Sequence, residues 1–220
     1  MKTSLLFPMP CAACGYNICY DELPFCSECL SDLQRLLTAR CRVCHNPPSA
    51  CVCPENKELR FAFFYNGFYA RRLIYANKKK PDPRLTDFWA ELAVRASGVK
   101  PKNYDAVAFV PRLRRNKRKY GCDQAELFAK SLSKLYGIPI IYALERIGGS
   151  EQKLLSRAER YKNMVGRFKL REDFPKGMNY NKILLVDDVC TTGATINACA
   201  GILRGSVARG VVPFVLAKTD

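Results

Sequence analysis

Nine of the twelve cysteines lie between residues 11 and 53, and eight of these form closely spaced pairs. Two thiolates separated by one or two residues on a tight turn can both face one metal ion, and two such pairs supply the four tetrahedral ligands of a structural zinc site. Pairing in sequence order predicts two Zn²⁺ sites, while interleaved pairing stays open. The pairs are Cys11 and Cys14, Cys26 and Cys29, Cys41 and Cys44, and Cys51 and Cys53, with Cys19 left over.

Two other interpretations apply to these cysteines. The run Cys41-Arg-Val-Cys44-His45 also matches the Cys-x-x-Cys-His pattern of covalent haem attachment. Haem of this type is attached after export, and the apolar run before Pro8 is far shorter than the ~7 to 15 residues of a signal peptide. Unligated or redox-active thiols are the remaining alternative. Because zinc explains all four pairs with one chemistry, we prefer zinc, with His45 as a bystander or a substitute ligand.

A second chemical pattern runs from Lys182 to Thr195, where an apolar strand leads into two acids, a loop of small residues and a helix. Backbone N–H groups of a Thr-Thr-Gly-Ala-Thr turn that opens a helix form a nest for a phosphate, and Gly193 lets the backbone approach the anion. The carboxylates of Asp187 and Asp188 accept hydrogen bonds and suit a pair of sugar hydroxyls. The string predicts a ribose 5-phosphate site, because an ordinary loop with a helix cap explains only single features of it.

The elements that must position these residues alternate between strand-like and helix-like segments after residue 58. Such alternation predicts an α/β fold with a parallel sheet flanked by helices, and ligands of such folds bind beyond the carboxyl ends of the strands. The expected strands are 61–67, 106–110, 138–142, 182–186 and 211–216, and the expected helices are 123–136 and 194–203. Because the cysteine-rich composition ends at a polar connector, we expect a small zinc-ribbon domain over residues 1–57 and an α/β domain over residues 58–220.

The formal net charge of +16 indicates a polyanionic partner. Basic residues are bunched in residues 71–84 and in residues 112–119, where they occupy six of eight positions. Bunching favours a nucleic-acid-binding face over an acidic membrane surface or a merely solvated one. The expected contact residues are Lys78, Lys79, Lys80, Arg114, Arg115, Lys117, Arg118 and Lys119. No apolar run approaches the ~18 residues of a membrane span, so we expect a cytoplasmic protein.

Four blocks together resemble the ComF family of competence proteins: the cysteine-rich segment, residues 110–127, residues 152–168, and the acid pair followed by residues 191–195, the Thr-rich loop. The last block is similar to the motif of type I phosphoribosyltransferases that binds 5-phosphoribosyl 1-pyrophosphate (PRPP). The resemblance implies a type I phosphoribosyltransferase-like fold in which Asp187 and Asp188 bind the ribose and Mg²⁺ bridges the ribose hydroxyls and the diphosphate. The residues implied for the phosphate are Thr191, Thr192, Gly193, Ala194 and Thr195, and those at the diphosphate-loop position are Val110, Pro111 and Arg112.

The same resemblance implies that the basic stretch up to Lys119 is a loop that closes over the ligand. Asp123 stands where the family usually has Asn, and it adds a negative charge beside the proposed anion site. The role that Asn plays in the family is therefore an open question for this chain.

Three functions are compatible with these features. The first is a protein of DNA uptake in natural transformation that binds single-stranded DNA and PRPP or ribose 5-phosphate, with a competence helicase or another uptake protein as a further partner. The second is an active phosphoribosyltransferase with a nucleobase-like acceptor. The third is a zinc-built adaptor, which the intact phosphate motif argues against. Because no segment resembles the region that reads an acceptor base, no catalytic residue is assigned.

Overall fold

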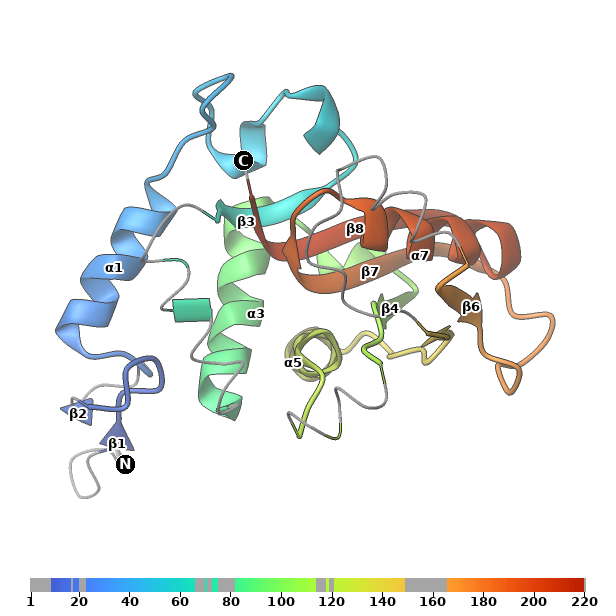
Figure 1. Ribbon diagram of the computed structural model, residues 1–220, viewed down its shortest axis with the longest axis horizontal. Helices are drawn as coiled ribbons and strands as arrows, with labels where there is room; N and C mark the ends of the chain where they lie inside the picture. The colour runs from blue at the N-terminus through green and yellow to red at the C-terminus, as the bar shows by residue number, and fades with distance from the viewer. Residues whose placement is uncertain are drawn as a thin grey trace.

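The centre of the protein is a parallel sheet, seen in a computed structural model that describes residues 9–16, 18–19, 23–65, 70, 73–74, 82–113, 118, 121–148 and 166–219. The sheet has four strands in the order β3-β8-β7-β4 (Figure 1). All three pairings are parallel, so the expected α/β class is confirmed. The strands are β3 Arg60–Phe64, β4 Ala106–Phe109, β7 Tyr180–Cys190 and β8 Ala208–Lys218.

Residues 183–186 of β7 are apolar and buried on both faces of the sheet, and helices cover both faces (Figure 1). Neighbouring residues of a strand point to opposite faces. Leu184 and Val186 belong to the hydrophobic core that contains α3 and α5 residues. Ile183 and Leu185 belong to the core that contains α7 residues. The alternation therefore divides β7 into an α3/α5 side and an α7 side.

The helices begin and end at recognisable residues. Helix α3, Pro83–Ser97, starts after Asp82, whose carboxylate accepts a hydrogen bond from the Arg84 N–H at 2.9 Å. Helix α5, Gln124–Tyr136, starts after Asp123 and ends at Gly137, whose φ is 70°. Helix α7, Ala194–Ser206, directly follows the Thr-rich loop. Short 3₁₀ helix η4, Pro101–Asn103, leads into β4.

The cysteine-rich segment packs against α3. It contains β1 Met9–Pro10 and β2 Ile18–Cys19, which pair antiparallel, then α1 Ser27–Leu37 and the short helices η2 Pro48–Ala50 and η3 Pro54–Asn56. The Phe25 ring lies 4.9 Å from the Phe88 ring and 5.8 Å from the Trp89 ring. Cys29 is fully buried in the same core as these aromatic residues. The two predicted domains thus share a hydrophobic core, and their boundary near residue 58 stays a prediction.

Two sequence-based expectations about strands differ from the structure. Residues 138–142 form only one parallel bridge, between Ile140 and Val107, because Pro139 lacks the N–H that a ladder requires. Strand β7 does not end at Val186 but continues through both acids to Cys190, where it still pairs with β8. The short hairpin of β5, Leu144–Arg146, and β6, Phe168–Leu170, was not expected from the sequence.

The helices of the described ranges are all too short or too polar to cross a membrane.

Candidate phosphate site and cysteine clusters

The Thr-rich loop leaves the carboxyl end of β7 and leads into α7. It lines a small cavity together with the end of the strand. Gly193 has a φ of +77°, and a Cβ atom on it would lie 3.2 Å from the side-chain amide of Asn197, so the turn requires glycine. The amino end of α7 adds a partial positive charge. The cavity is lined by Asp187, Val189, Cys190, Thr191, Thr192, Gly193, Ala194, Thr195 and Ile196.

The end of β8 holds this loop in place. The Thr219 N–H donates to the Cys190 carbonyl at 2.9 Å, and the Thr219 hydroxyl donates to the Thr191 carbonyl at 3.3 Å. Cys190 is buried, and burial raises the pKa of its thiol, so it stays protonated at neutral pH. Cys190 therefore serves as a small packing residue under the loop rather than as a reactive thiolate.

The two acids that follow the apolar part of β7 point to opposite faces of the sheet. Asp187 lines the cavity of the Thr-rich loop. Asp188 lines a different cavity, between α3, α5 and the sheet. The cause is the continuation of β7 beyond Val186, since strand geometry separates neighbouring side chains. The structure thus brings Asp187 to the predicted phosphate site and places Asp188 on the α3/α5 side.

The carboxyl of Asp187 has a pKa well above its ordinary value. The largest cause is burial of the carboxyl, although the residue keeps part of its surface exposed, and the next is the negative charge of Asp188. A bond from the Asp188 N–H to Asp187 Oδ1, at 2.8 Å, acts in the opposite direction. The raised pKa means that the negative charge of Asp187 is disfavoured in the free protein. The site therefore favours a ligand that brings positive charge or hydroxyl donors to this carboxylate.

Asp123 has a defined structural role beside this site. Its Oδ1 accepts the Ala125 N–H at 3.2 Å and so caps α5, and its Oδ2 accepts the Arg112 N–H at 2.8 Å. The Val110 N–H donates to the Val186 carbonyl at 3.0 Å, which places the start of the predicted diphosphate loop beside β7 at the residue before Asp187. Asn has only one side-chain oxygen, so it could not accept the two bonds on two separate oxygens as Asp123 does. Aspartate at this position therefore ties the loop of residues 110–112 to α5.

The cysteines form two clusters of four, in the sequential pairing. Within each cluster all four Sγ atoms lie within 4.8 Å of one another. The Sγ–Sγ distances are 3.9 Å for Cys14–Cys26, 3.6 Å for Cys41–Cys53 and 3.7 Å for Cys44–Cys51. A tetrahedral ion with Zn–S bonds of about 2.3 Å separates its sulfur ligands by about 3.8 Å. The clusters are Cys11, Cys14, Cys26 and Cys29, and Cys41, Cys44, Cys51 and Cys53.

These distances fit a metal site and not disulfides. All twelve cysteines lie in the described ranges, and none of them forms a disulfide. A disulfide would need a sulfur separation of about 2.05 Å. His45 is not a member of either cluster, and it occupies the turn after Cys44 with a φ of 55°. Cys19 is buried outside the two clusters, and burial raises its pKa to about 11.

Polar contacts surround both clusters. The Cys26 N–H donates to Cys11 Sγ at 3.4 Å, and the Asn56 side-chain amide donates to Cys51 Sγ at 3.1 Å. Such bonds stabilise thiolates and orient them toward an ion. Sequence reasoning missed Asn56, because its distance of five residues from Cys51 belongs to no metal-binding spacing.

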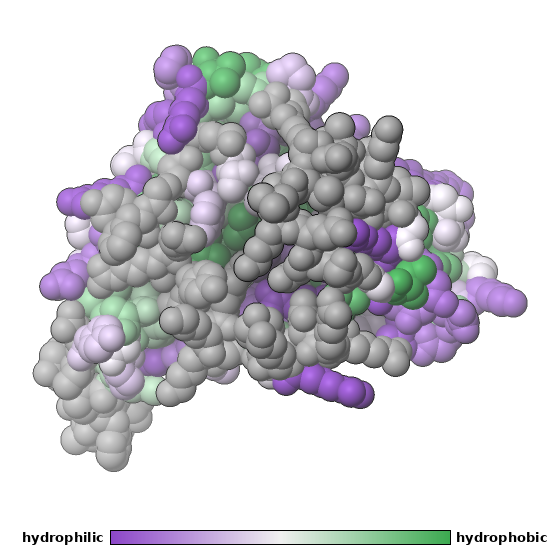
Figure 2. Space-filling model, in the orientation of Figure 1, coloured by the Kyte–Doolittle hydropathy of each residue, from purple (hydrophilic) through white to green (hydrophobic). Residues whose placement is uncertain are grey.

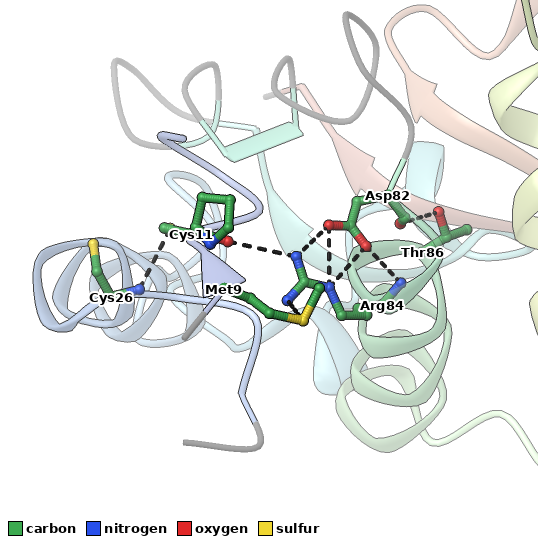
Figure 3. Close-up of polar contacts among 7 residues, drawn as sticks. Met9, Cys11, Cys26, Asp82, Arg84 and Thr86 are labelled. Carbon is green, nitrogen blue, oxygen red and sulfur yellow. Dashed lines mark hydrogen bonds and ion pairs between the residues drawn. The ribbon is translucent and has the colours of Figure 1, made fainter. Parts of the chain in front are cut away.

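The Arg84 side chain links the first cluster to α3 (Figure 3). Its guanidinium bonds the Asp82 carboxylate, with the shortest contact at 2.6 Å. The same group reaches Met9 Sδ at 3.2 Å and the Pro10 carbonyl at 3.4 Å, directly before Cys11. Asp82 is also the N-cap of α3, so one ion pair fixes both the start of the helix and the strand that leads into the cluster.

Most of the predicted nucleic-acid-binding residues lie outside the described residues. These are Lys78, Lys79, Lys80, Arg114, Arg115, Lys117 and Lys119. Arg118 is described and exposed. In the view of Figure 2, hydrophobic residues of the described surface appear only in separate small areas between hydrophilic ones.

Solved structures of phosphoribosyltransferases share some of this architecture. Orotate phosphoribosyltransferase from Aeropyrum pernix is 17% identical, with a TM-score of 0.36 over 67% of this chain and 75% of that chain. Adenine phosphoribosyltransferase from Leishmania tarentolae is 15% identical, with a TM-score of 0.39 over 67% of this chain and 75% of that chain. At such scores the fold assignment comes from the chain's own parallel strand order and flanking helices.

Curated relatives cover most of the chain, whereas no protein-family model matches it. Competence protein ComFC of Bacillus subtilis is 24% identical over 209 residues, which are 88% of this chain and 84% of that protein. Competence protein F of Haemophilus influenzae is 32% identical over 208 residues, which are 88% of this chain and 83% of that protein. With this identity and coverage, and with the two four-cysteine clusters ahead of the parallel sheet, the chain belongs to the competence protein F (ComF) family.

Proposed function

We propose that this protein acts in competence by binding a ribose 5-phosphate group, as in PRPP, with Mg²⁺ at the carboxyl end of β7. The observation that carries the proposal is that Asp187 and the Thr-rich loop line the same cavity. The loop and the amino end of α7 offer N–H and hydroxyl donors to a phosphate, and Asp187 offers an acceptor to a ribose hydroxyl. Mg²⁺ would neutralise the diphosphate.

The neighbouring loop supports a diphosphate at the same edge of the sheet. Residues 110–112 follow β4, whose last residue, Phe109, pairs in parallel with Val186, the residue before Asp187. The bond from the Arg112 N–H to Asp123 holds this loop against the start of α5. A diphosphate attached to the ribose would extend from Asp187 toward Arg112.

The glycine of the Thr-rich loop tests the site. We expect ribose 5-phosphate with Mg²⁺ to bind the wild-type protein in isothermal titration calorimetry. We expect Gly193→Ala to weaken binding about tenfold or more, the equivalent of one lost bond to a charged group, because the new methyl group crowds Asn197 and the anion.

The matched control is Gly177→Ala. Gly177 also has a positive φ, of +81°, but it lies in an exposed turn with nothing described within 4 Å of a Cβ atom. Both substitutions cost about 1 to 2 kcal/mol of backbone strain. Equal binding by the two variants, or no binding by the wild-type protein, would contradict the proposed site.

We further propose that the protein binds single-stranded DNA along the basic stretch of residues 112–119. The support is the net charge of +16 and the place of the stretch, which continues the chain directly from the loop at the carboxyl edge of the sheet. Because the same stretch would close over a diphosphate, PRPP and DNA should compete.

Salt dependence tests this proposal. Each phosphate neutralised on a single strand contributes about −0.7 to the log-log slope of affinity against salt, and we expect a slope of about −3 to −5 in fluorescence anisotropy. Replacing Arg114, Arg115, Lys117 and Arg118 with Ala should flatten the slope.

A control variant removes equal charge from the amino edge of the sheet, by replacing Lys100, Lys102, Lys176 and Arg209, all exposed, with Ala. Identical salt slopes for this control and for the variant of the basic stretch would show that binding depends on overall charge and not on the basic stretch.

We also propose that each cysteine cluster holds one structural Zn²⁺. The support is the all-sulfur donor set with tetrahedral spacing and the N–H bonds to Cys11 and Cys51. Four thiolate ligands leave no open position for substrate, so the ions would stabilise the fold rather than take part in chemistry.

A further inference from the structure

A second cavity lies between α3, α5 and the sheet, on the side of β7 opposite the Thr-rich loop. The space open to the centre of a water molecule is about 20 Å³. A buried water needs about 10 to 15 Å³ by this measure, so the cavity fits one water-sized group. It is lined by Ile74, Thr86, Trp89, Gln124, Phe128, Asp188 and Leu216.

Trp89 Nε1 and Gln124 Oε1 belong to residues that line this cavity, and both atoms are buried without a hydrogen-bond partner among the residues that the structure describes. Trp89 is 1% exposed and Gln124 is 5% exposed. Buried polar atoms are nearly always hydrogen-bonded, so a pair of orphaned atoms in one cavity indicates a ligand that bonds both.

Neither side chain can turn away to find another partner. The indole ring of Trp89 packs against the rings of Phe25, Phe63 and Phe88, at 5.8, 5.8 and 5.6 Å. The Gln124 side-chain amide donates from Nε2 to Cys122 Sγ at 3.1 Å, which leaves its oxygen for the cavity. One donor and one acceptor are therefore held in fixed positions beside Asp188.

We infer that this cavity is a binding site for a single O–H group, which accepts a hydrogen bond from Trp89 Nε1 and donates one to Gln124 Oε1. A hydroxyl or a water does both, whereas a carbonyl or an ammonium does only one. In the free protein the occupant is a water molecule.

The site gives Trp89 and Gln124 a role in orienting Asp188. A water bonded to both side chains has a second O–H group for the Asp188 carboxylate in the same cavity. Asp188 is joined directly to Asp187, so its orientation affects the ribose site on the other face of β7. Trp89 and Gln124 are therefore positioning residues. This last step rests on the proposed ribose phosphate function, whereas the occupied cavity does not.

The first test is independent of any ribose ligand. Trp89 is the chain's single tryptophan, so ¹⁵N labelling gives one indole N–H resonance. We expect cross-relaxation between this proton and a long-lived water in the free protein. The cross-peak should be retained in Thr86→Val, which removes the one hydroxyl side chain of the cavity's described lining. Gln124→Met should shift the resonance and remove the cross-peak. Absence of the water cross-peak in the wild-type protein would overturn the inference, and so would loss of the cross-peak in Thr86→Val.

The second test measures ligand affinity. We expect Trp89→Phe and Gln124→Met to weaken ribose 5-phosphate binding about three- to tenfold, as for one lost hydrogen bond. Leu132→Val alters the packing of the same helix, α5, at a buried residue that does not line the cavity, and it should leave affinity unchanged. Equal losses in all three variants would show a packing role and would overturn the positioning role.

A comparison with 2-deoxyribose 5-phosphate tests whether the water stays in place when a sugar binds. The cavity lies on the face of β7 opposite Asp187, so we expect Trp89→Phe and Gln124→Met to lose affinity for ribose 5-phosphate and for its 2-deoxy analogue equally. A loss confined to one of the two sugars would overturn the positioning role. Failure of the wild-type protein to bind either sugar contradicts the proposed function, while the water cross-peak still decides the cavity.

Discussion

Protein purified without chelators is expected to carry two Zn²⁺ per chain, and Cys29→Ser is expected to remove one of them and to unfold the segment around α1. Cys29 is 0% exposed and belongs to the core that α1 shares with α3. Structural zinc contributes on the order of 10 kcal/mol to the folding of small domains, so we expect a large loss of stability from this substitution.

Metal analysis and thermal unfolding measure this result. Cys199→Ala is the matched control, because Cys199 is also 0% exposed but lies on α7, outside both clusters. We expect it to keep both ions and to unfold at a slightly lower temperature. Two ions in Cys29→Ser, or no zinc in the wild-type protein, would show that the clusters do not act as metal sites.

Asp187→Asn is expected to stabilise the free protein at neutral pH and to weaken ribose 5-phosphate binding about ten- to a hundredfold. The raised pKa of Asp187 means that the folded state disfavours its charge. Asn removes that cost, while the ligand loses one or two bonds to an ionised group, at about 1.5 to 3 kcal/mol each. Opposite effects on stability and on binding are the signature of a functional carboxylate.

The pH dependence follows from the direction of the shift. Asp187 has a higher pKa in the folded state than in the unfolded state. The stability that its protonated carboxyl contributes is fully present below the unfolded pKa of about 3.9, and it is lost as the pH rises through the folded pKa. The advantage of Asp187→Asn in urea unfolding should therefore be absent at low pH and grow toward neutral pH.

The control is Asp173→Asn, at an acid that is 68% exposed in its ion pair with Arg171. It should change neither the unfolding midpoint nor ligand binding. A variant of Asp187 that is less stable than the wild-type protein at neutral pH would mean that its carboxylate is stabilised, not strained, in the free protein.

The sequence predicts the chemistry of the site better than its geometry. Residue types and spacing led to the sequential cysteine clusters, the parallel sheet and the place of the Thr-rich loop. The acids were expected to face one ligand together, because the strand was expected to end at Val186. The apolar residues Val189 and Cys190 are the signal of a longer strand, and alternation then separates Asp187 from Asp188.

Other features depend on contacts between distant segments and carry no local signal. Trp89 and Gln124 meet in one cavity only because α3 and α5 pack on the same face of the sheet. Arg84 reaches Pro10 across more than seventy residues of sequence. The local sequence predicts Asp123 as the cap of α5. The second hydrogen bond that Asp123 accepts, from the Arg112 N–H, depends on the path of the chain between the two residues.

The position of β8 has a consequence for the order in which the chain can fold during synthesis. β8 is the last of the described strands in sequence, yet it lies between β3 and β7 and pairs with both. A ribosome must therefore release β8 before β3, made some 150 residues earlier, can join the sheet. The cysteine clusters draw only on residues 11–53, so they can bind metal while the rest of the chain is still being translated. Metal capture would then precede closure of the sheet.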